Sequence, residues 1–158
     1  MDTLLFVYGT LMTGRSAHEQ YAQPAERLGE ACLPGLLFNL PGGYPGVVVS
    51  PEQVLTDTAC GSSVLLNCTH PQQEAVPLVH GELLRLLKPI EQLPRLDRYE
   101  DAAADGSGEY RRVLAAVWSG GEWKAAWIYC LTTLPSGRPM VDGRWSDHAL
   151  SSNSGVER

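Results

Sequence analysis

The chain has 158 residues, the length of one domain with a single core. Apolar residues make up 44% of it and charged residues 19%, a composition typical of a globular protein. The formal net charge is −6, and an acidic surface repels phosphate backbones, so we expect no nucleic-acid partner. The apolar run at residues 4–7 is too short to span a membrane and follows no basic signal-peptide region, so we expect a cytoplasmic protein without a membrane partner.

In the first half of the chain, runs of β-forming residues alternate with turn residues. Residues 3–8 form an apolar run that ends at a glycine, which predicts a buried strand. The Ser-x-x-Glu pattern at the start of residues 16–23 has the form of a capping box and predicts a short helix there. Two further strands are predicted at residues 28–40 and 44–50, separated by Pro-Gly-Gly. The polar stretch at residues 56–74 is expected to be a long loop or an irregular hairpin.

A strand is predicted at residues 76–87, and a helix directly after it. Pro89 fits the first position of this helix, where a missing N–H group costs nothing. The apolar stripe of the helix would consist of Ile90, Leu93 and Leu96. Pro94 falls inside the stripe, so we expect the helix to be broken near residues 92–93 or to begin later, with Pro94 in its first turn.

The remainder of the chain contains one more predicted pair of strands. Residues 102–108 have the composition of a flexible loop, and residues 110–118 and 123–131 form a predicted hairpin closed by Ser-Gly-Gly-Glu. Residues 151–158 have the composition of a disordered tail, which leaves a single domain at residues 1–150. About six strands, few helices and mostly hairpin connections favour an α+β domain around a barrel-like sheet.

The cysteines do not indicate a metal site. Cys32, Cys60, Cys68 and Cys130 have irregular spacings without a C-x-x-C pair, which predicts free thiols in a reducing compartment. A site built on Cys60, Cys68 and His70 is the alternative, but it lacks a fourth ligand and matches no standard zinc spacing. We therefore expect neither a metal nor another cofactor.

A candidate binding loop follows the first predicted strand, in the segment Tyr8-Gly9-Thr10-Leu11. Successive backbone N–H groups in such a turn have no partner in a sheet and can converge on an anion. Gly9 permits both a positive φ and the close approach of a ligand. An ordinary exit from a strand into a turn is the alternative interpretation.

Glu100 is the best-placed candidate for acid–base chemistry. It lies where the predicted helix ends, and the negative end of the helix dipole disfavours another negative charge there. Asp97 and Asp101 act in the same direction, so we expect a raised pKa, which suits a general base near neutral pH. The alternative is a solvated carboxylate at a helix end. Neither Glu82, inside a predicted strand, nor Glu109, in a predicted loop, has a feature that marks it for catalysis.

Five short motifs occur along the chain in a fixed order. They are Tyr8-Gly9-Thr10-Leu11, Gly43-Tyr44-Pro45-Gly46-Val47-Val48, Val79-His80-Gly81-Glu82-Leu83, Leu96-Asp97-Arg98-Tyr99-Glu100 and Tyr110-Arg111-Arg112-Val113. In this order they resemble the γ-glutamylcyclotransferase-like superfamily, in its AIG2-like and γ-glutamylamine cyclotransferase branch. The resemblance covers roughly residues 3–131.

The resemblance implies a small mixed β-barrel with flanking short helices, without a cofactor. It implies that the loop from Tyr8 to Leu11, with Gly9 and Thr10, holds the γ-glutamyl group of a small-molecule substrate, and that Glu100 is the catalytic glutamate. Tyr110 and Arg112 are candidate site residues by the same resemblance. The loop between Glu100 and Tyr110 is longer than usual for this branch, and the loop at residues 56–74 is expanded.

The implied reaction is the cyclisation of a γ-glutamyl amine or γ-glutamyl peptide to 5-oxoproline, with release of a free amine. The substrate carries its own nucleophile, so the protein mainly has to hold it in a reactive conformation. The γ-glutamylamine branch implies little action on glutathione. One alternative is a protein that only binds a γ-glutamyl or other small carboxylate ligand. Another is an enzyme with a different acyl chemistry, such as removal of a γ-glutamyl protecting group.

Overall fold

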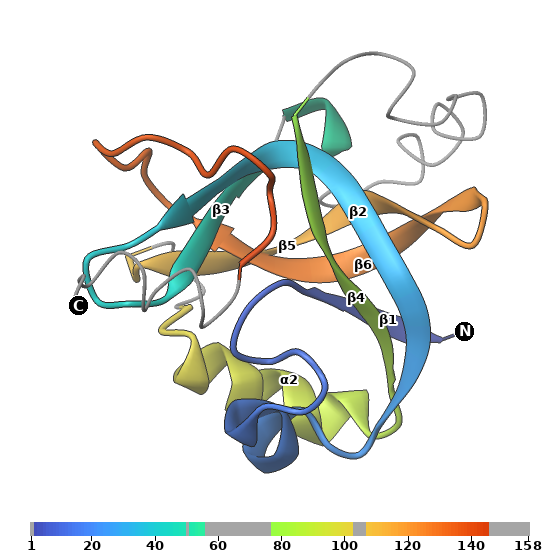
Figure 1. Ribbon diagram of the computed structural model, residues 1–158. Helices are drawn as coiled ribbons and strands as arrows, with labels where there is room; N and C mark the ends of the chain where they lie inside the picture. Colours follow the sequence, from blue (N-terminus) through green and yellow to red (C-terminus); the bar gives the residue numbers. More distant parts are fainter. Residues whose placement is uncertain (1, 50, 56–76, 103–106, 146–158) are drawn as a thin grey trace.

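The computed structural model describes residues 2–49, 51–55, 77–102 and 107–145. Its strands are β1 (Thr3–Val7), β2 (Ala25–Asn39), β3 (Pro45–Val49), β4 (Leu78–Leu86), β5 (Tyr110–Ser119) and β6 (Glu122–Leu131). The strand order is β3-β2-β4-β1-β6-β5, and a further pairing of β2 with β5 closes five of the strands into a barrel (Figure 1). Strand β3 lies outside this closure, paired to β2 only. The predicted α+β barrel is confirmed.

Strand β1 lies between β4 and β6, and both of its faces are buried. It pairs antiparallel with β4 and parallel with β6, where Leu5 is opposite Trp127. Side chains alternate across a strand, so Phe6 packs into one apolar cluster while Leu5 and Val7 pack into a second one. The second cluster includes Leu96 of the long helix. The continuous apolar run in the sequence therefore reflects two cores, one on each side of the strand.

Glycines shape the two longest strand pairs. Strand β2 curves across the barrel (Figure 1), and its register with β4 shifts between Arg27 and Gly29, where Gly29 has a φ of 139°. The predicted hairpin of β5 and β6 is confirmed, with Ser119 opposite Glu122. Its two-residue turn needs positive φ at both central positions, and the two glycines there, at residues 120 and 121, have φ of 63° and 84°.

The main helix, α2 (Pro89–Tyr99), contradicts the expected break. It is continuous and contains Pro94 in its interior. Gln92 and Leu96, on either side of the proline, are fully buried, and the Gln92 side chain donates to the carbonyls of Ala22 (2.7 Å) and Pro24 (2.9 Å). These tertiary contacts hold both halves of the helix in line, which offsets the one helical hydrogen bond that a proline removes.

The predicted apolar stripe of α2 is only partly right. Leu96 is fully buried and Leu93 is partly buried, but the side chain of Ile90 is 90% exposed. Gln92 takes the buried position in the first turns because the neighbouring segment at residues 22–24 presents backbone carbonyls that need donors. The Gln92 amide thus provides hydrogen-bond donors to buried carbonyls at a place where the sequence pattern predicts an apolar side chain.

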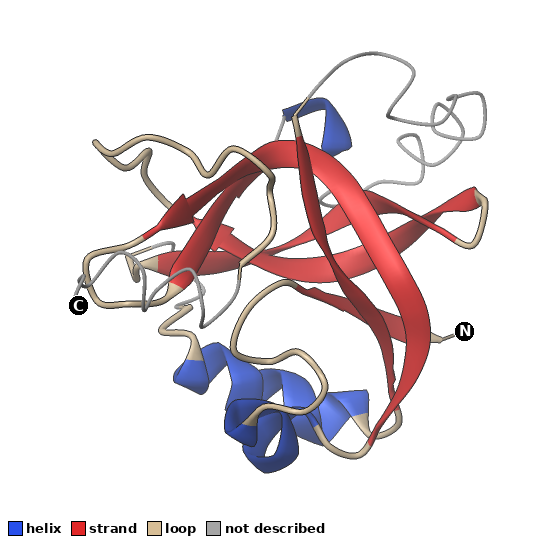
Figure 2. Ribbon diagram, viewed as in Figure 1, coloured by secondary structure: helices blue, strands red, loops and turns tan. Residues whose placement is uncertain are grey.

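A short helix, η1 (His18–Ala22), packs beside α2 at one side of the barrel (Figure 2). The predicted helix is present there, but as one turn of π-helix with Ala17 at its N-cap and no side-chain capping hydrogen bond, so the expected capping box is wrong. A 3-10 turn, η2, covers Pro51–Gln53. Tyr21 of η1 stacks on Tyr99 of α2 with ring centroids 4.3 Å apart. This contact ties η1 to the end of α2.

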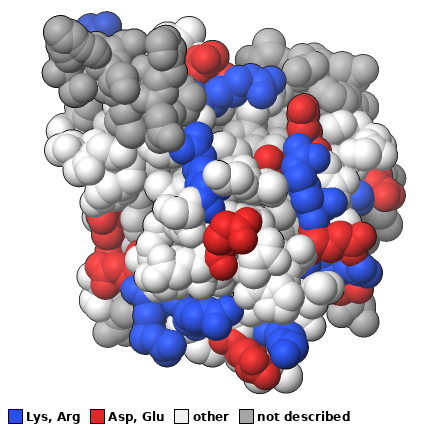
Figure 3. Space-filling model, turned by 60° about the horizontal axis from the view of Figure 1, so that its bottom comes forward, with Lys and Arg blue, Asp and Glu red and all other residues white. Residues whose placement is uncertain are grey.

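Some predicted segments lie outside the described residues. These are the loop at 56–74, most of the loop at 102–108 and the tail at 151–158. Within the described residues, no helix has the length and apolar character needed to cross a membrane. On the face shown in Figure 3, acidic and basic side chains are interspersed with uncharged ones.

Candidate active site

A pocket of about 390 Å³ opens where several strand ends and the C-terminal end of α2 meet. Its walls come from the exit of β1, the start of β3, the end of α2, the start of β5 and the end of β6. The lining residues are Phe6, Val7, Tyr8, Gly9, Thr10, Leu11, Tyr44, Pro45, Tyr99, Glu100, Glu109, Tyr110 and Tyr129. Every site residue named from the sequence except Arg112 therefore lines one cavity.

The segment after β1 lines this cavity with residues 8–11. Among the described residues, the N–H groups of Gly9, Thr10 and Leu11 donate to no backbone carbonyl, as expected for a turn that has left the sheet. Gly9 is not among the glycines with positive φ, so the loop does not use that freedom of the glycine. The glycine is needed for space, because a Cβ atom at this position would overlap the ring of Pro45.

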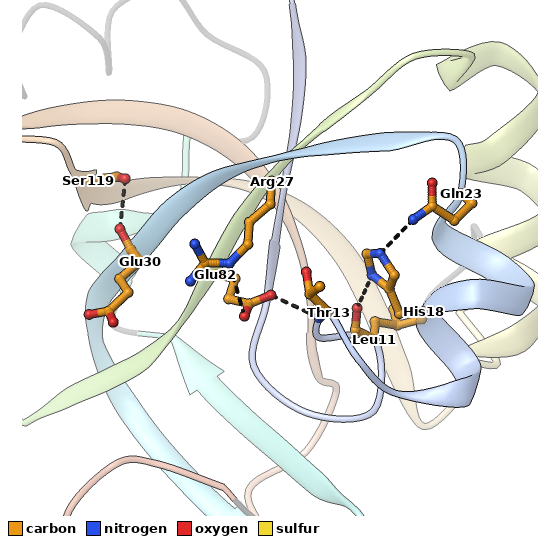
Figure 4. A network of polar contacts seen from close by, with 8 residues as sticks. All are labelled: Leu11, Thr13, His18, Gln23, Arg27, Glu30, Glu82 and Ser119. Atoms are coloured by element: carbon orange, nitrogen blue, oxygen red, sulfur yellow. Dashed lines mark hydrogen bonds and ion pairs between the residues drawn. The ribbon is translucent and has the colours of Figure 1, made fainter.

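Three hydrogen bonds fix the loop from Gly9 to Thr13, and Figure 4 shows the two that Leu11 and Thr13 make. The Met12 N–H donates to the Gly9 carbonyl (3.1 Å), which closes the turn. Nδ1 of the buried His18 lies 2.9 Å from the Leu11 carbonyl oxygen. The Thr13 N–H donates to a Glu82 carboxylate oxygen (2.9 Å). A loop held at three points is pre-organised, so a ligand bound to its amides pays little ordering cost.

Glu82 does not line this pocket; its carboxylate is bound by two neighbouring residues. Its second oxygen lies 3.2 Å from Nε of Arg27 on β2. The hydrogen bonds from Thr13 and the ion pair with Arg27 outweigh partial burial and lower the pKa of Glu82. Glu82 therefore stays ionised and anchors the loop after β1. A carboxylate with a lowered pKa is a weak proton acceptor near neutral pH, so Glu82 is poorly suited to act as the general base.

Glu100 occupies the C-cap of α2, and its N–H donates to the Leu96 carbonyl (2.9 Å). Its side chain lines the pocket and is only partly exposed. Burial raises the pKa of this carboxyl to about 7, and the charge of Glu109 acts in the same direction. The raised pKa predicted from the sequence is thus found, but burial and Glu109 cause it, not Asp97 or Asp101.

Asp97, one turn before Glu100, fastens the end of α2 to the barrel. Its carboxylate accepts hydrogen bonds from Nε (2.8 Å) and Nη2 (3.1 Å) of Arg112 and from the Tyr129 hydroxyl (2.7 Å). The Arg112 guanidinium also lies over the Trp127 ring, 4.5 Å from its centroid. Arg112 therefore acts on the pocket through Asp97 and does not line it.

The tyrosines of the pocket connect its walls. The Tyr110 hydroxyl donates to the Pro45 carbonyl (2.6 Å), and the Tyr8 hydroxyl donates to the Tyr129 carbonyl (2.7 Å). The Tyr99 hydroxyl lies 2.9 Å from Oγ1 of Thr10, which joins the end of α2 to the loop after β1. Burial is the largest cause of the raised pKa of Tyr110, followed by the charge of Glu100, so its hydroxyl remains protonated. Tyr110 is a pocket residue, as its motif implied.

The lining residues that sequence reasoning missed include three with polar side chains that face partners in the pocket walls: Tyr44, Tyr99 and Glu109. Tyr44 and Tyr99 lie inside the motifs that carried the resemblance, and that proximity was the available signal. Glu109 follows a long loop and had no such signal. In the structure the Tyr44 hydroxyl donates to a Glu109 carboxylate oxygen (2.8 Å), so the pocket holds a second carboxyl group.

The cysteine predictions are resolved for the described part of the chain. Cys32 and Cys130 are free and buried. Cys60, Cys68 and His70 lie outside the described residues. Of the residues that the structure describes, no three His, Cys, Asp or Glu side chains are grouped as metal ligands would be.

The family model of γ-glutamyl cyclotransferase, AIG2-like, matches residues 5–65 and 56–147. The chain therefore belongs to the AIG2-like γ-glutamyl cyclotransferase family. No curated protein sequence matches it closely enough to be counted a relative.

Solved structures share the fold at low sequence identity. YkqA from Bacillus subtilis is 24% identical with a TM-score of 0.60; the alignment covers 98% of this chain but 43% of YkqA. The protein PH0828 from Pyrococcus horikoshii is 19% identical with a TM-score of 0.58, and the alignment covers 97% and 98% of the two chains. An AIG2-like protein from Mus musculus is 21% identical with a TM-score of 0.55 and coverages of 85% and 80%. The present chain thus spans less than half the length of YkqA.

Proposed function

We propose that the protein is a γ-glutamyl cyclotransferase that converts a γ-glutamyl amine into 5-oxoproline and a free amine. One observation carries the proposal: a carboxyl group whose pKa is raised to about 7, that of Glu100, lines the same pocket as the backbone N–H groups of residues 9–11. A proton acceptor poised near neutral pH and an anion-binding loop are the two groups that this cyclisation needs.

The pocket suits the γ-glutamyl group in size and polarity. A cavity of about 390 Å³ is within the range for a small-molecule site. The N–H groups of Gly9, Thr10 and Leu11 bind the α-carboxylate of the substrate, and the pocket tyrosines pack against its aliphatic chain. This arrangement bends the chain so that the α-amine approaches the γ-carbonyl, which can supply several kcal/mol of the rate enhancement.

The reaction then requires two protons to leave the α-nitrogen and to reach the departing nitrogen. The ionised Glu100 carboxylate removes a proton from the α-ammonium group, and the free amine attacks the γ-carbonyl carbon. A C–N bond forms, and the carbonyl oxygen becomes a tetrahedral oxyanion. The protonated Glu100 gives its proton to the departing nitrogen as the original C–N bond breaks. The ring nitrogen then loses its second proton, which the same carboxylate passes on to the released amine, so 5-oxoproline and an ammonium ion leave and Glu100 is again ionised.

A 5-oxoproline release assay tests the proposal with γ-glutamyl-ε-lysine, γ-glutamyl-alanine and glutathione as substrates. We expect turnover of γ-glutamyl-ε-lysine and little turnover of glutathione. Efficient cleavage of glutathione alone would contradict the assignment to the γ-glutamylamine class. Saturable binding of the substrates without any release of 5-oxoproline would instead support the alternative, a binding protein for small γ-glutamyl ligands.

A further inference from the structure

His18 is a buried side chain that the catalytic proposal leaves unused. It is 3% exposed and does not line the pocket. Nδ1 of its ring lies 2.9 Å from the Leu11 carbonyl oxygen, and Nε2 lies 2.9 Å from Nε2 of Gln23 (Figure 4). Because both nitrogens have a partner, the ring is held in one orientation, with Nδ1 directed at the loop after β1.

The neighbouring amide places the proton on this ring. The Ala25 N–H donates to Oε1 of Gln23 (3.1 Å), so the amino group of the Gln23 side chain is the end that faces His18. An amide nitrogen can only donate, so Nε2 of His18 accepts and the neutral ring carries its proton on Nδ1. The Nδ1–H group therefore donates to the Leu11 carbonyl.

The carbonyl that accepts from His18 belongs to the peptide group that closes the turn of the binding loop. The Leu11 carbonyl and the Met12 N–H lie in one peptide plane, and that N–H donates to the Gly9 carbonyl (3.1 Å). The plane is thus held at both ends, and a rotation would break both hydrogen bonds. It would also open the turn and move the N–H groups of residues 9–11, to which the proposed function assigns the carboxylate of the substrate.

The segment next to His18 is attached to the helix that carries Glu100. The carbonyls of residues 22–24 accept hydrogen bonds from Nε2 of Gln92 (2.7 and 2.9 Å) and from Nη2 of Arg95 (3.1 Å). Several contacts share this attachment, so the loss of one of them leaves the segment in place. The hydrogen bond from Nδ1 of His18 then connects the segment to the backbone of the binding loop.

We propose that His18, oriented by Gln23, is a positioning residue for the cyclisation. It sets the peptide plane between Leu11 and Met12, and so aligns the binding amides of the loop with the carboxyl group of the base. This inference rests on the proposed function. Loss of the hydrogen bond leaves the pocket and the base in place but misplaces the amides, and a misplacement of about 1 Å can lower a rate about a hundredfold.

Two substitutions of similar size separate this role from the filling of space. His18→Asn places an amide near the position of Nδ1 and can still donate to the Leu11 carbonyl, whereas His18→Leu cannot. Both lose the contact with Gln23, so they share that structural loss. We measure 5-oxoproline release from γ-glutamyl-ε-lysine at a temperature where circular dichroism shows every variant to be folded. The kcat of His18→Leu should fall about tenfold to a hundredfold. His18→Asn should stay within about threefold of the parent.

Two further measurements address the ring and the residue that orients it. The ¹⁵N resonances of His18 at mildly alkaline pH should show a neutral ring protonated on Nδ1, and protonation on Nε2 would overturn the proposal. Gln23→Met should lower kcat in the parent but not further in His18→Asn, because the two residues act through one contact. Gln20→Met, the same change at an exposed position of η1, is the matched control and should leave kcat unchanged.

The outcomes keep the positioning role apart from the proposed function. A His18→Leu variant as active as the parent would overturn the positioning role and leave the proposed function standing, and so would a His18→Asn variant as impaired as His18→Leu. Release of no 5-oxoproline by the parent would refute the proposed function, and the positioning role with it.

Discussion

Replacing Glu100 with glutamine should stabilise the protein at alkaline pH but not at acidic pH. The Glu100 carboxyl is partly buried beside Glu109, so its ionised form is less favourable in the folded protein than in the unfolded chain. Glutamine keeps the shape of the side chain and carries no charge at any pH. The substitution therefore removes an unfavourable ionisation and leaves the surrounding contacts in place.

The size and sign follow from the pKa. One pKa unit corresponds to about 1.4 kcal/mol, so the rise from 4.5 to about 7 costs the folded state about 3 kcal/mol once Glu100 is ionised. Between these two pH values the unfolded chain has released the proton and the folded protein still holds it. Stability therefore falls as pH rises from 4.5 to about 7, and the full loss is present above pH 7.

Urea unfolding of both proteins across this pH range measures the difference. The advantage of Glu100→Gln should grow from near zero at about pH 4 to about 3 kcal/mol at about pH 8. Glu91→Gln corrects for the loss of one negative charge on α2. Parallel stability curves for Glu100→Gln and the parent would show that the pKa of Glu100 is not raised. The same ionisation should make the kcat/KM of the parent rise with pH through about 7.

Three further substitutions test the packing around the site. Asp97→Ala should lower the unfolding free energy by about 3 kcal/mol in urea, because the buried Tyr129 hydroxyl and a guanidinium lose their acceptor; an unchanged midpoint would refute this clamp. Gly9→Ala should lower kcat/KM at least about tenfold with an unchanged circular dichroism spectrum, since its Cβ overlaps Pro45, and full activity would contradict the tight approach. Gln92→Leu should lower the unfolding free energy in urea by about 2 kcal/mol, because the carbonyls of Ala22 and Pro24 lose their donor. Activity at low temperature should be retained. A stability equal to that of the parent would contradict the structural role of the Gln92 amide.

The strands were predictable because their signals are local. The apolar run of β1 ends at a glycine, and the two-residue Gly-Gly turn between β5 and β6 requires positive φ that few other residues adopt. The closure of the barrel depends on pairs such as Cys32 opposite Trp118, far apart in the sequence. No periodicity encodes such a pair. The number of strands and their hairpin connections favoured a barrel-like sheet, and the ordered motifs implied a barrel, but neither identified the strands that close it.

The errors in α2 have a tertiary cause. Pro94 and the apolar Ile90 are correctly read as a helix breaker and a core residue when only the helix itself is considered. The partner surface changes both outcomes. It offers the carbonyls of Ala22 and Pro24, so Gln92 is the side chain that becomes buried and Ile90 points to solvent.

In the site, too, the features that depend on neighbouring residues in the sequence were predictable, and the contacts between distant residues were not. Glu100 could be found because a carboxylate at a helix end is visible in the sequence. Its burial and the charge of Glu109 beside it arise from parts of the chain that meet only in the fold, so neither follows from the local pattern. Likewise, Glu82 is locally an acid in a strand, and only its contact with Thr13 identifies it as an anchor of the binding loop.

The activity of Glu100→Gln in 5-oxoproline release is the most direct test of the central claim, that Glu100 moves the proton in the cyclisation. Glutamine cannot accept the proton of the α-ammonium group, while the backbone amides that bind the γ-glutamyl group remain. We expect kcat to fall about 10²–10⁴-fold, the usual contribution of a positioned acid–base group, with substrate binding largely retained. A variant as active as the parent, at any pH between about 6 and 8, would contradict the assignment of Glu100 as the base.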